Sequence, residues 1–219
     1  MGKEINLLKN YPRTVRDTSL RQKNKSESDQ EIARRFDYDF FDGERKYGYG
    51  GFNYNEKYWK NVIPDFIDFY SLNNDSSILD IGCGKGFMIY DFLKYLPEIN
   101  IKGIDISEYA IKNCKEEVKD NLIIGDAKNL PFDDNSFDLV ISIVSIHNLG
   151  INDCSKSLSE INRVSKKNSF ITVDAYKTEE EKQLMHDWNL TALTIMSCNE
   201  WVSFFKENNY KGDYYCFKP

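Results

Sequence analysis

From residue 77 onward, short apolar runs alternate with longer segments in which apolar residues recur at helical spacing. The apolar runs are continuous instead of alternating with polar residues, which is typical of parallel strands that are buried on both faces. Predicted strands occupy 77–81, 101–104, 122–124, 137–143, 170–173 and 214–217, and predicted helices occupy 86–96, 108–119, 153–166 and 201–208. This order predicts an α/β domain with a Rossmann-like, mostly parallel sheet of six or seven strands and helices on both faces.

The chain before this alternation has a different character. Residues 1–30 are polar and charged and are predicted to form a mobile tail or a marginal helix. Residues 31–55 combine aromatic side chains with glycine, and we expect a small cap whose Tyr47–Phe52 part folds over a ligand as a lid. The alternative for this segment is an aromatic cluster that only packs the cap onto the sheet.

The main domain is predicted to cover residues 56–219. It opens with apolar residues at helical spacing over 56–70, and Pro64 is expected to break or kink that helix. A second cap element around His186 and Trp188 is expected mainly to pack.

Composition narrows the function classes. The 219 residues carry a formal net charge of −6, which argues against tight binding to a nucleic-acid backbone. No run approaches the length of a membrane span, and the N-terminus lacks the apolar stretch of a signal peptide. Five widely spaced cysteines without a CxxC pair predict reduced thiols in a cytoplasmic protein, with neither a disulfide framework nor a zinc site. With two histidines in the whole chain, we expect no metal centre.

The segment LDIGCGKG, residues 79–86, follows a predicted strand and opens a predicted helix. Glycines at 82, 84 and 86 allow the backbone to approach a ligand closely in a tight strand-to-helix turn. Free backbone N–H groups at the start of the helix would then face that ligand. Asp80 and Cys83 belong to the same turn, and an acid at position 80 suits a cationic amino group better than a pyrophosphate. Taken alone, such a glycine pattern is as often an ordinary turn.

Asp105 ends the next predicted strand, about 20 residues after the glycine turn, where open α/β sheets place a carboxylate that binds ribose hydroxyls. The alternative is a helix N-cap, a role that Ser107 fills equally well. Ile106 adjoins the same site.

Asp126 and Ala127 follow the third strand. The Asp126 carboxylate can accept a hydrogen bond from an exocyclic adenine amine, and the Ala127 N–H can donate to a ring nitrogen. Ser142, at the end of the fourth strand, is a further candidate for this site.

These three signals in this order resemble the class I S-adenosylmethionine-dependent methyltransferases with a type 11-like methyltransferase domain. The resemblance covers roughly 78–173. It implies S-adenosylmethionine as cofactor, a seven-stranded sheet with one antiparallel strand, and three carboxylates along the cofactor. Asp80 and the glycine turn would hold its methionine end, Asp105 its ribose, and Asp126 with Ala127 its adenine. The chain departs from the family at its end, where room remains for one strand; either the sheet has six strands or 191–196 supplies the seventh. The cap sequence is also similar to that of bacterial methyltransferases of surface-polysaccharide or secondary-metabolite pathways.

His147 follows the fourth strand, at the carboxyl end of the sheet where open α/β folds bind ligands, and is the predicted catalytic base. The alternative is a loop histidine that only packs. Further substrate-binding candidates are Tyr47, Tyr49, Asn148, Asp174 and Tyr176.

Compact length, acidic charge and a cap favour methyl transfer to an O or N atom of a small metabolite, such as a sugar or amino-acid derivative. The partner is then a small-molecule acceptor, with no nucleic acid and no membrane, and the oligomeric state stays open. The alternatives are a methyltransferase of RNA or protein, or a non-catalytic cofactor-binding protein. Neither an Asn/Asp-Pro-Pro-aromatic motif after the fourth strand nor an appended basic module supports the macromolecular alternative.

Overall fold

The central feature of the computed structural model, which describes residues 2–12, 25–50 and 53–218, is a seven-stranded sheet. Its strands are β1 (Ser77–Ile81), β2 (Asn100–Asp105), β3 (Leu122–Ile124), β4 (Phe137–Ile143), β5 (Ser165–Tyr176), β6 (Met196–Ser197) and β7 (Asp213–Phe217). The order is β3-β2-β1-β4-β5-β6, and β7 also pairs with β5. The α/β, Rossmann-like prediction is therefore confirmed, with seven strands.

All strand pairs of the described sheet are parallel, so the prediction of one antiparallel strand is wrong. The connection between the last two strands explains why they are parallel. A full helix, α9 (Cys198–Glu207), joins β6 to β7 and returns the chain to the same end of the sheet, whereas a hairpin would reverse it. The expected strand in 191–196 is reduced to Met196 and Ser197, at the end of that range.

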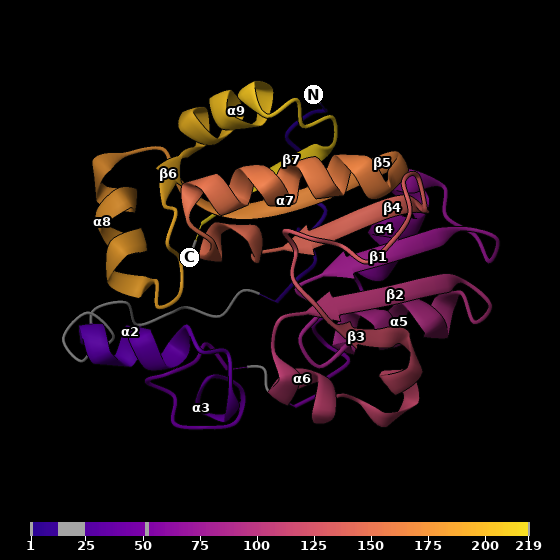
Figure 1. The fold of residues 1–219 in the computed structure, drawn as a ribbon, viewed down its shortest axis with the longest axis horizontal. Helices are drawn as coiled ribbons and strands as arrows, with labels where there is room; N and C mark the ends of the chain where they lie inside the picture. Colours follow the sequence, from indigo (N-terminus) through magenta and orange to yellow (C-terminus); the bar gives the residue numbers. More distant parts are fainter. Residues whose placement is uncertain (1, 13–24, 51–52, 219) are drawn as a thin grey trace.

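Helices pack on both faces of the sheet. They are α2 (Glu27–Ala33), α3 (Tyr38–Phe41), α4 (Ile63–Tyr70), α5 (Phe87–Tyr95), α6 (Glu108–Lys112), α7 (Ile151–Val164), α8 (Glu179–Trp188) and α9, with short 3-10 helices at Glu116–Asn121 and Ile146–Asn148. Figure 1 shows α7 on one side of the sheet and α4 and α5 on the other, while α2, α3 and α8 gather beyond the end toward which the strands point.

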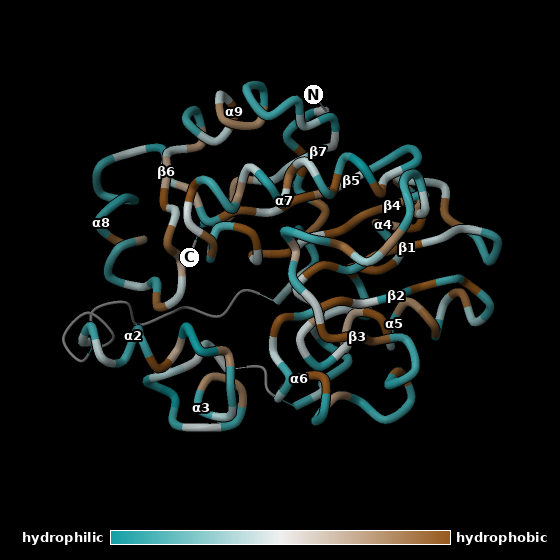
Figure 2. The backbone as a smooth tube through the Cα atoms, in the orientation of Figure 1, coloured by the Kyte–Doolittle hydropathy of each residue, from teal (hydrophilic) through white to brown (hydrophobic). Residues whose placement is uncertain are grey.

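Two apolar cores separate along these faces. On one face α7 and α9 bury Leu158, Ile161 and Trp201 against the sheet, and on the other α4 and α5 bury Phe66 and Phe92. Figure 2 shows the hydrophobic colour concentrated in the central strands and the hydrophilic colour on the outer helices and loops. Burial of both sheet faces explains why the strand sequences are continuously apolar. Among the helices that the structure describes, none combines the length and apolarity needed to cross a membrane.

The helix expected over 56–70 begins only at Ile63, because Pro64 lies in its first turn, where a missing N–H costs nothing.

The N-terminal segment also differs from the prediction of a polar tail. Residues 2–12 pack on the domain, burying Leu7 and Leu8, and Glu4 forms a parallel bridge with Tyr214 of β7. Part of the predicted tail, residues 13–24, lies outside the described residues.

The expectation of reduced cysteines without a disulfide is wrong for one pair. Cys198 at the start of α9 and Cys216 in β7 form a disulfide that spans 18 positions. It joins the helix and the strand that complete the edge of the sheet. Cys83, Cys114 and Cys154 remain as free thiols.

We expect Cys216→Ala to lower the free energy of unfolding by about 3 kcal/mol, because a closed loop of this length restricts the unfolded chain. Urea unfolding with and without a thiol reductant measures this. The reductant should lower the stability of the wild type to that of the variant and leave the variant unchanged. Cys114→Ala, which removes a half-buried free thiol, is the control. Equal wild-type stability in both conditions would contradict the crosslink.

Candidate functional site

The glycine turn between β1 and α5 has a backbone that other residues tolerate poorly. Gly82 and Gly86 adopt φ values of +78° and +76°. A Cβ on Gly82 would collide with the side chain of Ser145, and one on Gly86 would come within 2.8 Å of Val118. The Gly82 N–H donates to the Ile104 carbonyl at 2.8 Å, which fixes the turn against the end of β2. The glycines are therefore needed for the shape of the turn.

Two carboxylates are buried beside this turn. Asp105 accepts hydrogen bonds from the N–H groups of Gly84 and Ser107, both at 2.8 Å, and burial still raises the pKa of its carboxyl. Burial, with a smaller contribution from the charge of Asp105, raises the pKa of Asp80 to about 8. Two acids that resist ionisation in an apolar environment form a site for a cationic ligand, whose charge would stabilise the carboxylates.

The predicted ribose and adenine residues meet in one cavity of about 470 Å³, which we call the carboxylate groove. Asp105, Ile106, Asp126 and Ala127 line it, together with Gly82 and Gly84 of the turn. Ile106 is 57% exposed and offers an apolar surface to a flat ring. The Asp126 carboxylate accepts from the Lys128 N–H at 2.9 Å.

A second cavity of about 360 Å³ adjoins the groove. We call it the aromatic chamber, after lining residues from the N-terminal segment, the cap, the turns before α4, the start of α5, α8 and β7. They are Tyr11, Phe40, Phe41, Tyr49, Tyr58, Trp59, Phe87, Trp188 and Phe217. Groove and chamber share Phe40, Phe41, Gly82, Gly84, Ile143, Val144 and Asn148. The two cavities therefore form one continuous site that divides at the glycine turn.

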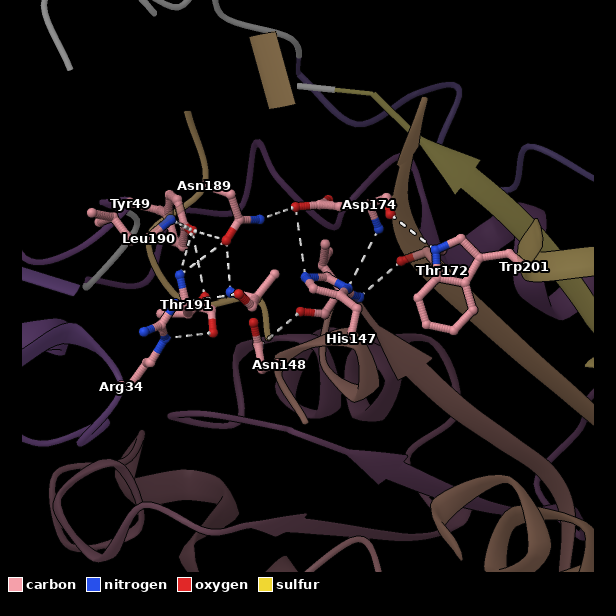
Figure 3. A network of polar contacts seen from close by, with 12 residues as sticks. Arg34, Tyr49, His147, Asn148, Thr172, Asp174, Asn189, Leu190, Thr191 and Trp201 are labelled. Atoms are coloured by element: carbon pink, nitrogen blue, oxygen red, sulfur yellow. Dashed lines mark hydrogen bonds and ion pairs between the residues drawn. The ribbon is translucent and has the colours of Figure 1, made fainter. Parts of the chain in front are cut away.

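His147 lies in the wall of the chamber and contacts Asp174 with both ring nitrogens (Figure 3). Its Nδ1 accepts from the Asp174 N–H at 3.4 Å, and its Nε2 lies 3.6 Å from the Asp174 carboxylate. Burial lowers the pKa of His147, although the charge of Asp174 opposes this. The contacts fit a neutral imidazole with its proton on Nε2.

The cap is connected to this pair through the segment after α8 (Figure 3). The Asn189 amide donates to Asp174 at 2.7 Å, and its oxygen lies 3.4 Å from the Tyr49 hydroxyl. Tyr49 also accepts from the Leu190 N–H at 2.6 Å, and Arg34 donates to the Thr191 carbonyl at 3.3 Å. Segments far apart in the sequence thus meet over the end of the sheet.

A buried ion pair that the sequence analysis missed ties the cap to the glycine turn. Lys85, with 7% of its side chain exposed, lies 2.6 Å from the Asp42 carboxylate, which also accepts from the Tyr109 hydroxyl at 2.7 Å. These two contacts keep the pKa of Asp42 below its usual value, although burial, the largest influence, acts in the opposite direction. A lysine among three glycines is the one signal that pointed to this contact.

Four of the predicted site residues do not line either cavity. Gly86 is the residue that precedes α5. Tyr47 packs under the Lys46 ammonium, and the Tyr176 hydroxyl contacts Glu200 at 3.4 Å. Ser142 is fully buried, and its hydroxyl has no hydrogen-bond partner among the described residues. Tyr49, Asn148 and the other predicted residues do reach the site. Of the lid segment, residues 51 and 52 lie outside the described residues.

In the part of the chain that the structure describes, one group of possible metal ligands comes close together, Glu4 with Cys198 and Cys216. The disulfide occupies both of these sulfur atoms. The group lies outside the linings of groove and chamber.

Residues 79–173 match the protein family described as a methyltransferase domain. A relative, the tRNA (carboxymethyluridine(34)-5-O)-methyltransferase of Arabidopsis thaliana, is 34% identical over 146 residues, which cover 66% of this chain and 34% of the relative. The demethylmenaquinone methyltransferase of Thermotoga maritima is 28% identical over 123 residues, covering 56% of this chain and 51% of the relative. The crystal structure of the YcgJ protein from Bacillus subtilis, 22% identical, shares the fold with a TM-score of 0.55 and covers 67% of this chain and 66% of that chain. The chain spans about a third of the length of the first curated relatives that it matches.

We expect Asp105→Ala to weaken S-adenosylmethionine binding by about tenfold to a hundredfold, because hydrogen bonds to a buried carboxylate contribute about 1.5–3 kcal/mol each. Isothermal titration calorimetry measures the affinity. Asp187→Ala removes a half-buried carboxylate of α8 that lines neither cavity, and should leave the affinity unchanged. An unchanged affinity for Asp105→Ala would reject the ribose assignment.

The affinity for S-adenosylmethionine should rise with pH, and this affinity should level off above about pH 8. Below that pH the free protein holds Asp80 protonated, and the ligand favours its ionised form, so binding must release a proton. Linkage then gives up to about a tenfold change in affinity per pH unit. Calorimetry between pH 6 and 9 tests this, with Asp80→Asn as control, since the amino group of the ligand titrates identically with both proteins. A wild-type profile equal to that of the variant would contradict the role of Asp80.

Proposed function

Because residues 79–173 form a methyltransferase domain of the S-adenosylmethionine-dependent class, we propose that this chain transfers the methyl group of S-adenosylmethionine to an O or N atom of a small metabolite. When bound, that cofactor supplies a methyl group that is already activated by its positive sulfur. The chain itself has to bind both reactants, align them and exclude water.

The observation that carries the proposal is the shared wall of the groove and the chamber at Gly82 and Gly84. Asp105 and Asp126 suit the ribose and adenine at the far end of the groove. Asp80 suits the cationic methionine end at the turn, where the groove opens into the chamber. A methyl donor that follows these carboxylates presents its reactive end to the chamber, which leaves the chamber as the acceptor site.

His147 and Asp174 face that acceptor site together and are the groups that we assign to proton removal. A hydroxyl or amine acceptor loses its proton as it is methylated, and a fixed base within hydrogen-bond reach assists this step. Burial lowers the pKa of His147, so its neutral ring can hold the Asp174 carboxylate through the Nε2 proton while that carboxylate takes up the proton of the acceptor. Asn189 holds the Asp174 carboxylate in place from the other side.

A methyltransferase of RNA is the second candidate, since one relative is named as a tRNA methyltransferase. Its support is the similarity of the matched region. Against it stand the net charge of −6 and an acceptor site roofed by the cap, which suits a small molecule better than a folded nucleic acid. The acceptors of these relatives differ, so similarity alone does not choose between them.

Radiolabelled S-adenosylmethionine, incubated with the full chain and a cell extract, distinguishes these candidates. After separation by size, we expect label in the small-molecule fraction. Exclusive label in RNA or protein would favour the macromolecular alternative, and no label in any fraction despite binding would favour a non-catalytic role. His147→Gln should lower turnover about a hundredfold, because the basic Asp174 carboxylate loses the ring that holds it, and leave the affinity for the methyl donor unchanged. Retained turnover would exclude His147 as part of the base.

A further inference from the structure

The chamber restricts which acceptors can enter. We propose that the acceptor is a flat, uncharged molecule that offers an O–H or N–H group to Asp174, and that molecules carrying a carboxylate are rejected. This inference rests on the proposed function, since it assigns the acceptor to the chamber.

Aromatic rings from separate parts of the chain form the walls. Tyr11 packs against Tyr58 and Trp59 with ring centroids 5.4 and 5.2 Å apart. Tyr49 of the cap and Trp188 of α8 lie 5.8 Å apart with tilted rings. Rings of this kind gain most from a flat partner that offers a face or an edge to them. A bulky, saturated acceptor such as a sugar makes fewer such contacts.

The charges of the chamber oppose an anionic ligand. Among its described lining residues, Asp80 and Asp174 carry acidic side chains, and Lys85 is the one lysine or arginine. The Lys85 ammonium is already paired with both oxygens of Asp42, at 2.7 and 2.6 Å. A ligand carboxylate would therefore lose its water beside Asp174 without a positive side chain in exchange. The positive sulfur of the methyl donor in turn disfavours a cationic acceptor.

Asp174 is held so that it accepts a hydrogen bond. Asn189 donates to its Oδ2 at 2.7 Å, and the His147 Nε2 lies 3.6 Å from the same oxygen. The indole N–H of Trp201 donates to the Asp174 backbone carbonyl at 3.2 Å. A carboxylate fixed in this way in the wall of an apolar cavity selects ligands that bring a donor.

The transfer step balances with these groups. The acceptor atom forms a bond to the methyl carbon while the bond from that carbon to sulfur breaks, and the electron pair of the broken bond stays on sulfur. The proton of the acceptor passes to the Asp174 carboxylate and leaves to water with the products. No oxidant, reductant or further reactant is needed.

Two matched probes test whether the chamber rejects a ligand that carries a carboxylate. The full chain, loaded with S-adenosylhomocysteine, is titrated by calorimetry at pH 7.5 with 4-methylphenol and with 4-hydroxybenzoate, which differ in one methyl or carboxylate group. We expect the neutral phenol to bind at least about tenfold more tightly. Asp174→Asn removes the opposing charge and should reduce this ratio to about threefold or less by tightening 4-hydroxybenzoate. Asp187→Asn changes a half-buried carboxylate of α8 that lines neither cavity, so it should keep the wild-type ratio.

Phenol and cyclohexanol test the requirement for a flat ligand. The wild type should prefer phenol about fivefold or more, and Trp59→Leu should lose most of that preference, because stacking on the indole contributes to it. Tyr95→Leu replaces an aromatic side chain that is 43% exposed and lies outside the chamber lining, so it should behave as the wild type. Unchanged affinity for S-adenosylhomocysteine shows that each variant is folded.

The outcomes separate the two proposals. If S-adenosylhomocysteine binds but 4-hydroxybenzoate binds as tightly as 4-methylphenol, or neither probe binds, the inference about the acceptor is wrong and the proposed function stands. If the wild type binds neither S-adenosylmethionine nor S-adenosylhomocysteine, the proposed function itself fails. The ratio of the two probe affinities in the wild type tests the rejection of carboxylates even where a variant does not fold.

Discussion

The burial of Asp80 and Asp105 beside the glycine turn is the constraint on which the site depends. Neither carboxyl ionises easily there, because burial raises the pKa of both, and the charge of Asp105 raises that of Asp80 further. Backbone N–H groups of Gly84 and Ser107 offset part of this cost at Asp105. A positive ligand beside them would stabilise both ionised carboxylates, which is why the proposed function places the cationic end of the methyl donor at this turn.

The same turn determines where the cap sits. Lys85, carried by the glycine segment, holds Asp42 of the cap, and Tyr109 of α6 binds the same carboxylate. On the other side Tyr49 reaches the segment that positions Asp174 through Asn189. The cap is thus attached both to the glycine turn and to the segment that holds Asp174. Hydrogen bonds and one ion pair make these two attachments.

Sequence reasoning predicted those features that follow from local patterns. The bounds of β1, β3 and β4 agree residue for residue, since each is a continuous apolar run between polar turns. The carboxylates at the strand ends meet as expected because parallel strands point to one edge. Contacts between distant positions were not predictable. Lys85 and Asp42 are 43 positions apart, and the spacing of Cys198 and Cys216 does not reveal their distance in space.

The groove and the chamber are built largely from different parts of the chain, and this limits what similarity to relatives can reveal about the acceptor. Asp105 and Asp126 of the groove, and Asp80, which lines the chamber at the glycine turn, lie within residues 79–173, the region that matches the family. Most of the aromatic residues that line the chamber lie outside that region, in the N-terminal segment, the cap, the turns before α4, α8 and β7. Asp174 follows the last residue of the region. The carboxylates of the groove therefore belong to the matched region, whereas most aromatic walls of the chamber do not. A relative that matches this chain in the groove can therefore differ from it in the walls of the chamber. For this reason the acceptor has to be inferred from the chamber of this chain.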